Sequence, residues 1–303
     1  MMRRSDPANR NTAFHAVRPA GFQLAEPGAC RLEARRPHTH DACVPLARIC
    51  RIDSIIFSLL LALAASVFSE DAVKPESLGY KLVWSDEFDG KALDAAKWST
   101  DYAPKVHPLG CNNERQSYAP ENTVLRDGHL VLLAERKVRE GMKFTSGMIA
   151  SHDKFPREYG WFEARMKLPK GKGMWPAFWM LPQSKIWPPE IDIMEHKGRL
   201  PNRAFLTLHE RQAGTWRPKS TGKEWDGPDF TGDFHTFALE WRAEGLRWYV
   251  DGIERHQWNG KADFGPMYVI LNLAVGGDFD GDPDAATPFP GEMQIDYVRV
   301  FAK

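Results

Sequence analysis

The sequence has few cysteines and no excess of basic residues. Four cysteines occur in 303 residues, and only Cys111 lies after position 69. A single cysteine cannot form an internal disulfide, so we expect the C-terminal part to depend on its packed core, with Cys111 as a quiet packed thiol. Lys and Arg number 40, against 40 Asp and Glu. With no basic stripe along the chain, nucleic acid is not expected as a partner.

A run of apolar residues long enough to span a bilayer is also missing. The longest run, residues 55–67 (IIFSLLLALAASV), is too short for a membrane span. It follows Arg48 and Arg51 and ends in small residues, which is typical of a secretory signal cleaved after Ser69. The sequence therefore predicts a secreted protein with no stable membrane span. The alternative is that the run is retained as an anchor helix.

The domain boundaries follow from this segment. We predict an N-terminal extension with signal peptide over residues 1–69 and a single domain over residues 70–303. A signal normally starts near the first residue, so residues 1–43 are expected to be a mis-assigned start. Translation would then begin at Val44 or Leu46.

Long helical periodicity is absent after Tyr80, where short apolar segments are separated by Gly, Pro, Asp and Asn. Many short strands with turn residues between them predict an all-β sandwich or jelly roll. Tryptophan, by contrast, is abundant, with 11 residues. The apolar face of a sugar ring stacks well on an indole, so this composition favours a carbohydrate ligand.

Residues 190–196 (EIDIMEH) hold three carboxylates separated by apolar side chains. The alternation predicts a half-buried strand with Glu190 and Asp192 on one face. Strict alternation would send Glu195 to the apolar face. One extra residue near Ile193 and Met194, a β-bulge, would return it to the polar face, and bulges are common beside active sites.

Two carboxylates that face one bond are the equipment of a glycosidase, one as nucleophile or base and one as proton donor. Their mutual repulsion separates their pKa values and keeps one of them protonated. The Cα atoms of Glu190 and Glu195 would lie roughly 13 Å apart on a flat strand. Long side chains on a concave sheet can close that gap, so we expect a retaining enzyme. The alternatives are an acidic edge strand and a calcium-binding patch.

This motif, preceded by GMWPAFWML at residues 173–181, resembles the signature of family-16 glycoside hydrolases, specifically the laminarinase-like endo-β-1,3-glucanases. The resemblance spans nearly the whole chain after residue 80. It implies a β-jelly-roll sandwich of two curved antiparallel sheets with an open concave substrate cleft. It further implies Glu190 as nucleophile, Glu195 as acid/base and Asp192 as the residue that orients and tunes Glu190, with no cofactor required for catalysis.

The resemblance leaves the polymer open. The main expectation is a secreted endo-glycosidase that hydrolyses laminarin-type β-1,3-glucan by double displacement. Alternatives are mixed-linkage β-1,3-1,4-glucan, an algal galactan of the agar or carrageenan type, and a non-catalytic glucan-binding protein. Loss of the catalytic glutamates is typical of the last class, and both are present here. Nothing indicates oligomerisation, so a monomer is expected.

The resemblance also implies substrate-binding residues. Trp175 and Trp179 lie four apart and share a face of a strand, with pure packing as the alternative for one of them. Trp187 is a third candidate, on the rim. Asn113, in the pattern Asn-Asn-Glu-x-Gln-x-Tyr, is a candidate sugar ligand, and capping of the turn is the alternative role for it. Asn272, within the apolar segment 267–277, is expected to face the cleft.

Two charged residues are further candidates. Arg165, on an alternating strand, is expected to orient a carboxylate or hydroxyl, with a structural pair to Glu163 as the alternative. His209 lies in a strand that is expected to pair with the catalytic strand. There it is expected to tune the acid/base residue or bind substrate. The alternative is a buried histidine whose hydrogen bonds are simply satisfied within the fold. Residues 211–230 are expected to form a polar loop with Trp216 and Trp225.

A structural calcium ion is implied by the same resemblance. Glu87, Gly128 and Asp296 match positions that hold calcium on the convex side in relatives. Calcium takes six to eight oxygen ligands, which carboxylates, backbone carbonyls and waters can supply. The alternative is that these are ordinary exposed acids at strand ends.

Overall fold

The computed structural model describes residues 71–303 except residues 213 and 216. The predicted N-terminal extension, with the apolar segment 55–67 and the alternative starts, lies outside the described residues, as does Trp216. Within the part of the chain that is described, no helix has the length and apolar character needed to cross a membrane.

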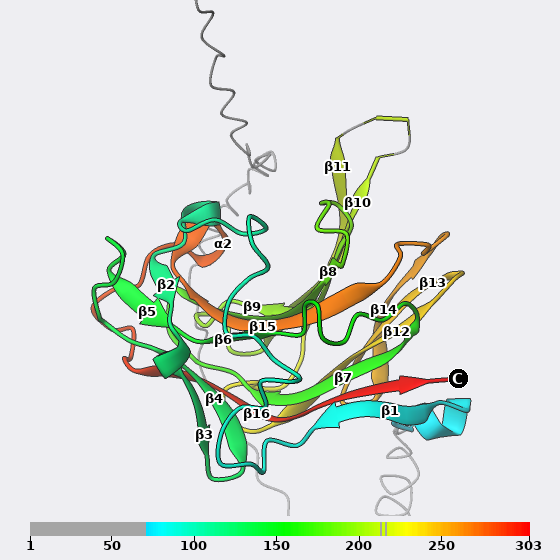
Figure 1. The fold of residues 1–303 in the computed structure, drawn as a ribbon, viewed down its shortest axis with the longest axis horizontal. Helices are drawn as coiled ribbons and strands as arrows, with labels where there is room; N and C mark the ends of the chain where they lie inside the picture. Colours follow the sequence, from blue (N-terminus) through cyan, green and yellow to red (C-terminus); the bar gives the residue numbers. More distant parts are fainter. Residues whose placement is uncertain (1–70, 213, 216) are drawn as a thin grey trace, which may run out of the picture. The chain divides into compact units, whose positions relative to one another are not determined.

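The larger of two stacked sheets has eight strands (Figure 1). In spatial order these are β14 (Ile253–Asn259), β13 (Gly245–Val250), β12 (His235–Arg242), β7 (Gly160–Lys167), β16 (Gly291–Ala302), β4 (His129–Ala134) and β3 (Thr123–Arg126), with β1 (Lys81–Asp86) paired to β16. All pairings in this sheet are antiparallel. The turn at Asp251 and Gly252 joins β13 to β14, as the Asp-Gly pair predicts.

The second sheet has six strands and carries the candidate site. In spatial order these are β11 (Pro218–Asp226), β10 (Arg203–Arg211), β9 (Glu190–His196), β8 (Met174–Pro182), β15 (Met267–Val275) and β6 (Met148–Ala150). It curves away from the eight-stranded sheet, which makes its outer face concave (Figure 1). The predicted jelly roll of two curved antiparallel sheets is therefore confirmed.

Shorter elements connect the sheets. They are the 3-10 turns η1 (Pro75–Leu78), η2 (Cys111–Asn113) and η3 (Pro120–Asn122), the short helix α2 (Gly277–Asp280), and the strands β2 (Gln116–Tyr118) and β5 (Phe144–Ser146). β2 and β5 pair in parallel, an arrangement that the sequence did not predict.

The hydrophobic core fills the space between the two large sheets. Ile191, Ile193 and Met194 of β9 belong to it, together with Trp248 of β13 and Phe237 of β12. Since one face of β9 is sealed by this core, its polar side chains are confined to the concave outer face. We call this the outer face of the six-stranded sheet.

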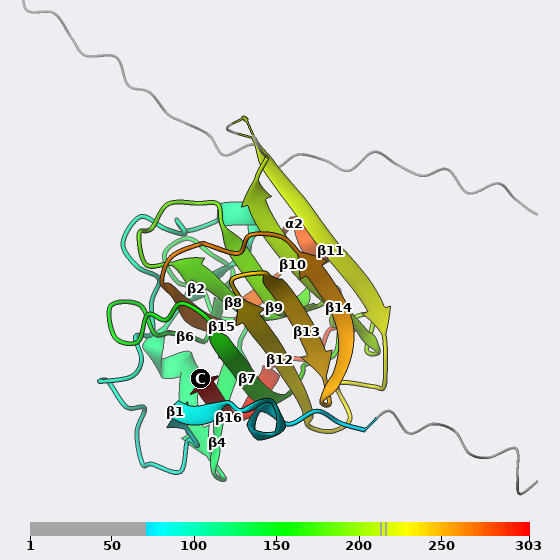
Figure 2. The ribbon, with the colours of Figure 1, turned by 90° about the vertical axis from the view of Figure 1, so that its right-hand side faces the viewer.

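The prediction that residues 211–230 form a polar loop is wrong. The middle of this segment is the strand β11, which pairs with β10 along nine positions from Arg211–Pro218 to Arg203–Asp226. The resulting β10–β11 hairpin extends past the neighbouring strands (Figures 1 and 2). β11 is an edge strand whose side chains are mostly exposed, so it lacks the apolar alternation by which a half-buried strand is recognised.

Candidate active site

The central feature of the site is a β-bulge in β9. Asp192 pairs with Trp179 of β8 and Glu195 pairs with Ala177, so three steps along β9 match two steps along β8. The same extra residue appears against β10, where Asp192 and Glu195 face Thr207 and Phe205. The bulge predicted near Ile193 is therefore confirmed. It brings Glu195 to the same face as Glu190 and Asp192, and we call these three the carboxylate row.

Each glutamate of the row accepts a hydrogen bond from an indole. Trp175 Nε1 donates to Glu195 Oε1 over 2.9 Å, and Trp187 Nε1 donates to Glu190 Oε2 over the same distance. Trp175 comes from β8, and Trp187 from the loop that precedes β9. Because an indole N–H is only a donor, each bond fixes one carboxyl oxygen as acceptor and leaves the second for other partners.

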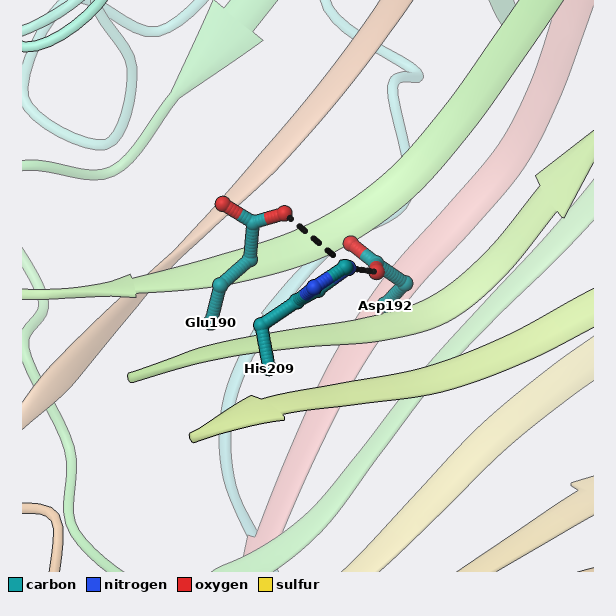
Figure 3. A group of neighbouring side chains, drawn as sticks. All are labelled: Glu190, Asp192 and His209. Carbon is teal, nitrogen blue, oxygen red and sulfur yellow. Dashed lines mark hydrogen bonds and ion pairs between the residues drawn. The ribbon is translucent and has the colours of Figure 1, made fainter. Parts of the chain in front are cut away.

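Asp192 sits deeper than the two glutamates and is bound by His209 (Figure 3). His209 Nε2 lies 3.0 Å from Asp192 Oδ2 and 3.7 Å from Glu190 Oε1. The other ring nitrogen, Nδ1, lies 2.8 Å from Ser220 Oγ. His209 thus connects Asp192 to Glu190 and is itself oriented by the edge strand β11.

Burial raises the pKa of all three carboxyl groups of the row, because the sheet removes water from the charged forms. For Glu195 the pKa rises to about 8, with the charge of Asp192 as a second cause and the Trp175 hydrogen bond acting in the opposite direction. A carboxyl group that keeps its proton near neutral pH is what a general acid requires. The charges of Asp192 and Glu195 also raise the pKa of Glu190.

The predicted aromatic residues lie on the same face but differ in access. Trp175 is partly exposed and stacks on Phe279 with ring centroids 4.9 Å apart. Trp179 is only 8% exposed and packs edge-on against Tyr102. Its N–H donates to Asn272 Oδ1 over 2.7 Å. Trp187 is 40% exposed. The structure therefore leaves Trp175 and Trp187 accessible beside the row, while Trp179 is committed to packing.

The two predicted asparagines are placed differently. Asn272 of β15 bridges Trp179 and Tyr118, donating to the Tyr118 hydroxyl over 2.8 Å. Asn113 ends η2 and donates to Asp278 of α2 over 2.8 Å. The backbone oxygen of its neighbour Asn112 and the ring of Trp175 both lie close to Gly277, because a Cβ atom added to that glycine would contact both. Asn113 therefore lies at the rim on the Trp175 side of the site.

The prediction that Arg165 binds substrate is wrong. Arg165 lies on β7 of the other sheet, on the face opposite the core residues Ala164 and Met166. Its Nη1 binds Asp296 Oδ2 over 2.6 Å, and its guanidinium lies over the Phe234 ring. Alternation along the strand assigned its face correctly but could not tell which sheet would carry the site.

The side chains of the expected calcium site are engaged by arginines. Glu87 accepts two hydrogen bonds from Arg299, at 3.0 and 2.7 Å. Asp296 is bound by Arg165 and lies 3.6 Å from His129 Nε2. As arranged, these carboxylates do not fit calcium, because the ion would have to displace two guanidinium groups. Calcium binding here stays a prediction, and no step below depends on it.

Ser220 and Phe279 belong to the site and were not predicted. Ser220 reaches His209 only because the β10–β11 register places the two opposite each other. No local pattern in the polar segment around Ser220 indicates that pairing. Phe279 lies in α2, two residues after the pair Gly276-Gly277, and stacks on Trp175. A single aromatic residue in a short Gly/Asp-rich segment is a weak signal by itself.

Comparisons with known proteins agree with this geometry. Residues 112–299 match the model of glycosyl hydrolases family 16. The chain is 36% identical to a beta-glucanase of Rhodothermus marinus, over 81% of this chain and 93% of that protein. It is also 36% identical to glucan endo-1,3-beta-glucosidase A1 of Niallia circulans, over 75% of this chain but only 38% of that longer protein.

A solved structure gives the same result. The laminarinase catalytic domain of Thermotoga maritima MSB8 superposes with a TM-score of 0.68 at 36% identity, covering 74% of this chain and 98% of that one. The family match covers well over half of the chain and includes the whole carboxylate row. This chain belongs to glycosyl hydrolase family 16.

Proposed function

We propose that this protein is an endo-glycosidase that hydrolyses β-1,3-glucan of the laminarin type with retention of anomeric configuration. The observation that carries the proposal is the bulge in β9, which brings Glu190 and Glu195 to one concave face. Relatives named for glucan endo-1,3-β-glucosidase and laminarinase activity support the choice of polymer. A concave sheet face suits the binding of an extended polymer and cleavage within it.

In the first step Glu190 acts as nucleophile. Trp187 holds Oε2, so Oε1 attacks the anomeric carbon and forms a C–O bond as the glycosidic C–O bond breaks. Glu195 gives its proton to the leaving oxygen. Trp175 binds Oε1 of Glu195, which leaves Oε2 to carry that proton. The raised pKa of Glu195 keeps the proton available near neutral pH.

In the second step the deprotonated Glu195 accepts a proton from water. The resulting hydroxide attacks the anomeric carbon from the face that the leaving group occupied, and the bond to Glu190 breaks. Two inversions give net retention. Asp192 does not need to touch the sugar, because His209 connects it to Glu190 and transmits its charge and position.

The experiment compares Glu190→Gln and Glu195→Gln with wild type on laminarin, lichenan, agarose and carrageenan, measuring reducing-sugar release. We expect laminarin to be the preferred polymer and both variants to lose activity by several orders of magnitude. Glu224→Gln is the matched control, because this exposed carboxylate lies on the same sheet in an ion pair with Arg203. Full activity of Glu190→Gln would end the assignment.

Azide separates the two roles. With an activated glucoside, Glu190→Ala is expected to give the α-glycosyl azide, because azide replaces the missing nucleophile in a single inversion. Glu195→Ala is expected to give the β-glycosyl azide, because azide attacks the covalent intermediate. Exchange of these two products would reverse the assignment of nucleophile and acid/base.

We also propose that the protein is secreted and monomeric. The apolar segment 55–67 after two arginines supports secretion. Mass spectrometry of the N-terminal residue of the mature protein tests the cleavage site after Ser69 and the predicted start. Sedimentation measures the oligomeric state.

A further inference from the structure

Three potential metal-binding atoms converge beside the carboxylate row. His209 Nε2, one oxygen of Asp192 and one oxygen of Glu190 all lie within 4.8 Å of one another (Figure 3). The two distances from Nε2 are 3.0 Å to Asp192 and 3.7 Å to Glu190. Among the residues that the structure describes, no other set of three such side chains comes together in this way.

The spacing suits a four-coordinate divalent ion. Bonds of about 2.0–2.2 Å in a tetrahedron place the ligand atoms roughly 3.3–3.6 Å apart. The two distances from Nε2 fall on either side of this range. The Glu190 carboxylate would have to move inward to reach the ion. Its side chain is longer and more exposed than that of Asp192.

The orientation of the His209 ring also suits a metal ligand. Ser220 Oγ lies 2.8 Å from Nδ1, where it can accept the Nδ1–H bond. The Nε2 lone pair then points at the two carboxylates. Metal-binding histidines nearly always donate their second N–H in this way, because that bond fixes the tautomer and the ring angle. This contact comes from β11 and is independent of the acidic residues.

A positive charge belongs between these atoms. Two carboxylates in a poorly solvated site repel each other, and His209 Nε2 lies near both of them. Either a proton on Nε2 or a metal ion can supply the charge. The site is reachable from the outer face, since the side chains of His209 and Glu190 are 25% and 20% exposed. Substrate or water could fill the fourth position.

We propose that Glu190, Asp192 and His209 form a reversible site for a divalent transition metal such as Zn²⁺, which inhibits the enzyme when bound. One imidazole and two carboxylates suit such a metal better than calcium, which requires more oxygens. Metal binding does not depend on the proposed function. Its inhibitory effect does, because inhibition follows from occupation of the carboxylate assigned as nucleophile.

The binding test uses the intact protein without substrate. Calorimetry with Zn²⁺ is expected to give one ion per chain, and Co²⁺ is expected to give the intense visible absorption of a four-coordinate site. His209→Gln removes a ligand and should abolish both signals. Ser220→Ala keeps all three ligands and is expected to weaken binding about tenfold through loss of ring orientation. Asp278→Asn, an exposed carboxylate near the rim, should bind like wild type.

Thermal melts without metal check that the variants are folded. If Zn²⁺ does not bind, or binds His209→Gln as tightly as wild type, the charge between these residues is only a proton and the proposal is overturned. If His209→Gln does not fold, Ser220→Ala provides the test instead. A Zn²⁺ affinity of Ser220→Ala equal to that of wild type would also contradict the site.

The activity test distinguishes this proposal from the proposed function. Zn²⁺ is expected to inhibit laminarin hydrolysis at the concentrations at which it binds, and a chelator should restore the rate. Binding that depends on His209 without inhibition would overturn the inhibitory role and count against Glu190 as nucleophile. Absence of binding together with an inactive Glu190→Gln would reject the metal site and leave the hydrolase assignment standing.

Discussion

The indole N–H of Trp248 donates a hydrogen bond of 2.9 Å to the backbone carbonyl oxygen of Asp192. Trp248 lies on β13 of the eight-stranded sheet and is fully buried, so this bond crosses the core. Asp192 is the residue at which the bulge in β9 begins. A bulge interrupts the regular ladder, and the opposite sheet here holds its backbone in place.

Trp248→Phe should therefore reduce both stability and turnover. Losing the donor leaves a buried carbonyl unsatisfied, which costs about 1–3 kcal/mol. A bulge that shifts would misplace Glu195, and we expect kcat to fall on the order of tenfold. Trp241→Phe is the control, because that buried indole donates over 2.8 Å to Ala262, away from the bulge. Denaturation and kinetics should show similar stability losses but a lower kcat only for Trp248→Phe.

Trp175→Phe should shift the alkaline limb of the pH profile upward. The Trp175 hydrogen bond lowers the pKa of Glu195, so its removal should raise that pKa above about 8. An acid catalyst is active while protonated, and its activity is lost as pH rises through its pKa. Asp192, His209 and Lys197 also act on this group and remain unchanged. A profile of kcat/KM on laminarin that moved to lower pH would contradict the expected direction.

Glu195→Gln should stabilise the protein at alkaline pH. The pKa of Glu195 is raised in the folded state, from 4.5 to about 8. Its favourable contribution is complete below pH 4.5 and is lost as pH rises through about 8, because the unfolded chain releases the proton first. Glutamine has no proton to lose. We expect the Tm of the variant to exceed that of wild type by a few degrees at pH 8.

The same comparison at pH 4 supplies the control for Glu195→Gln. There the wild-type carboxyl group is protonated in both states, so the difference in Tm should be small. A Tm gain of equal size at both pH values would mean that packing, and not ionisation, explains the effect.

Calcium binding is tested by melts with added Ca²⁺ and with a chelator. If Glu87, Gly128 and Asp296 bind calcium, the ion should raise Tm and the chelator should lower it. Glu87→Gln should abolish the difference, with Asp282→Asn, an exposed carboxylate paired to Arg115, as control. Identical melts in all conditions would show that the pairs with Arg299 and Arg165 already complete this region.

Much of the site could be predicted because its signal is local. The alternation in residues 190–196 fixes which side chains share a face, and the displaced third carboxylate requires a bulge. The contribution of Trp248 could not be predicted, because it depends on how the two sheets stack. Ser220 was missed for a related reason, since an edge strand exposed on both faces has no apolar period. Arg165 was misassigned because alternation does not identify the sheet.

The bulge also limits how this enzyme can vary. Glu190 and Glu195 are carried on one uninterrupted strand, so their separation is set by residue count and not by loop movement. If the strand kept all its residues but lost the bulge, strict alternation would turn Glu195 into the apolar interior. Loops at the rim can lengthen or shorten to suit other polymers, but one further residue inserted between Asp192 and Glu195 beside the bulge would turn Glu195 into the core.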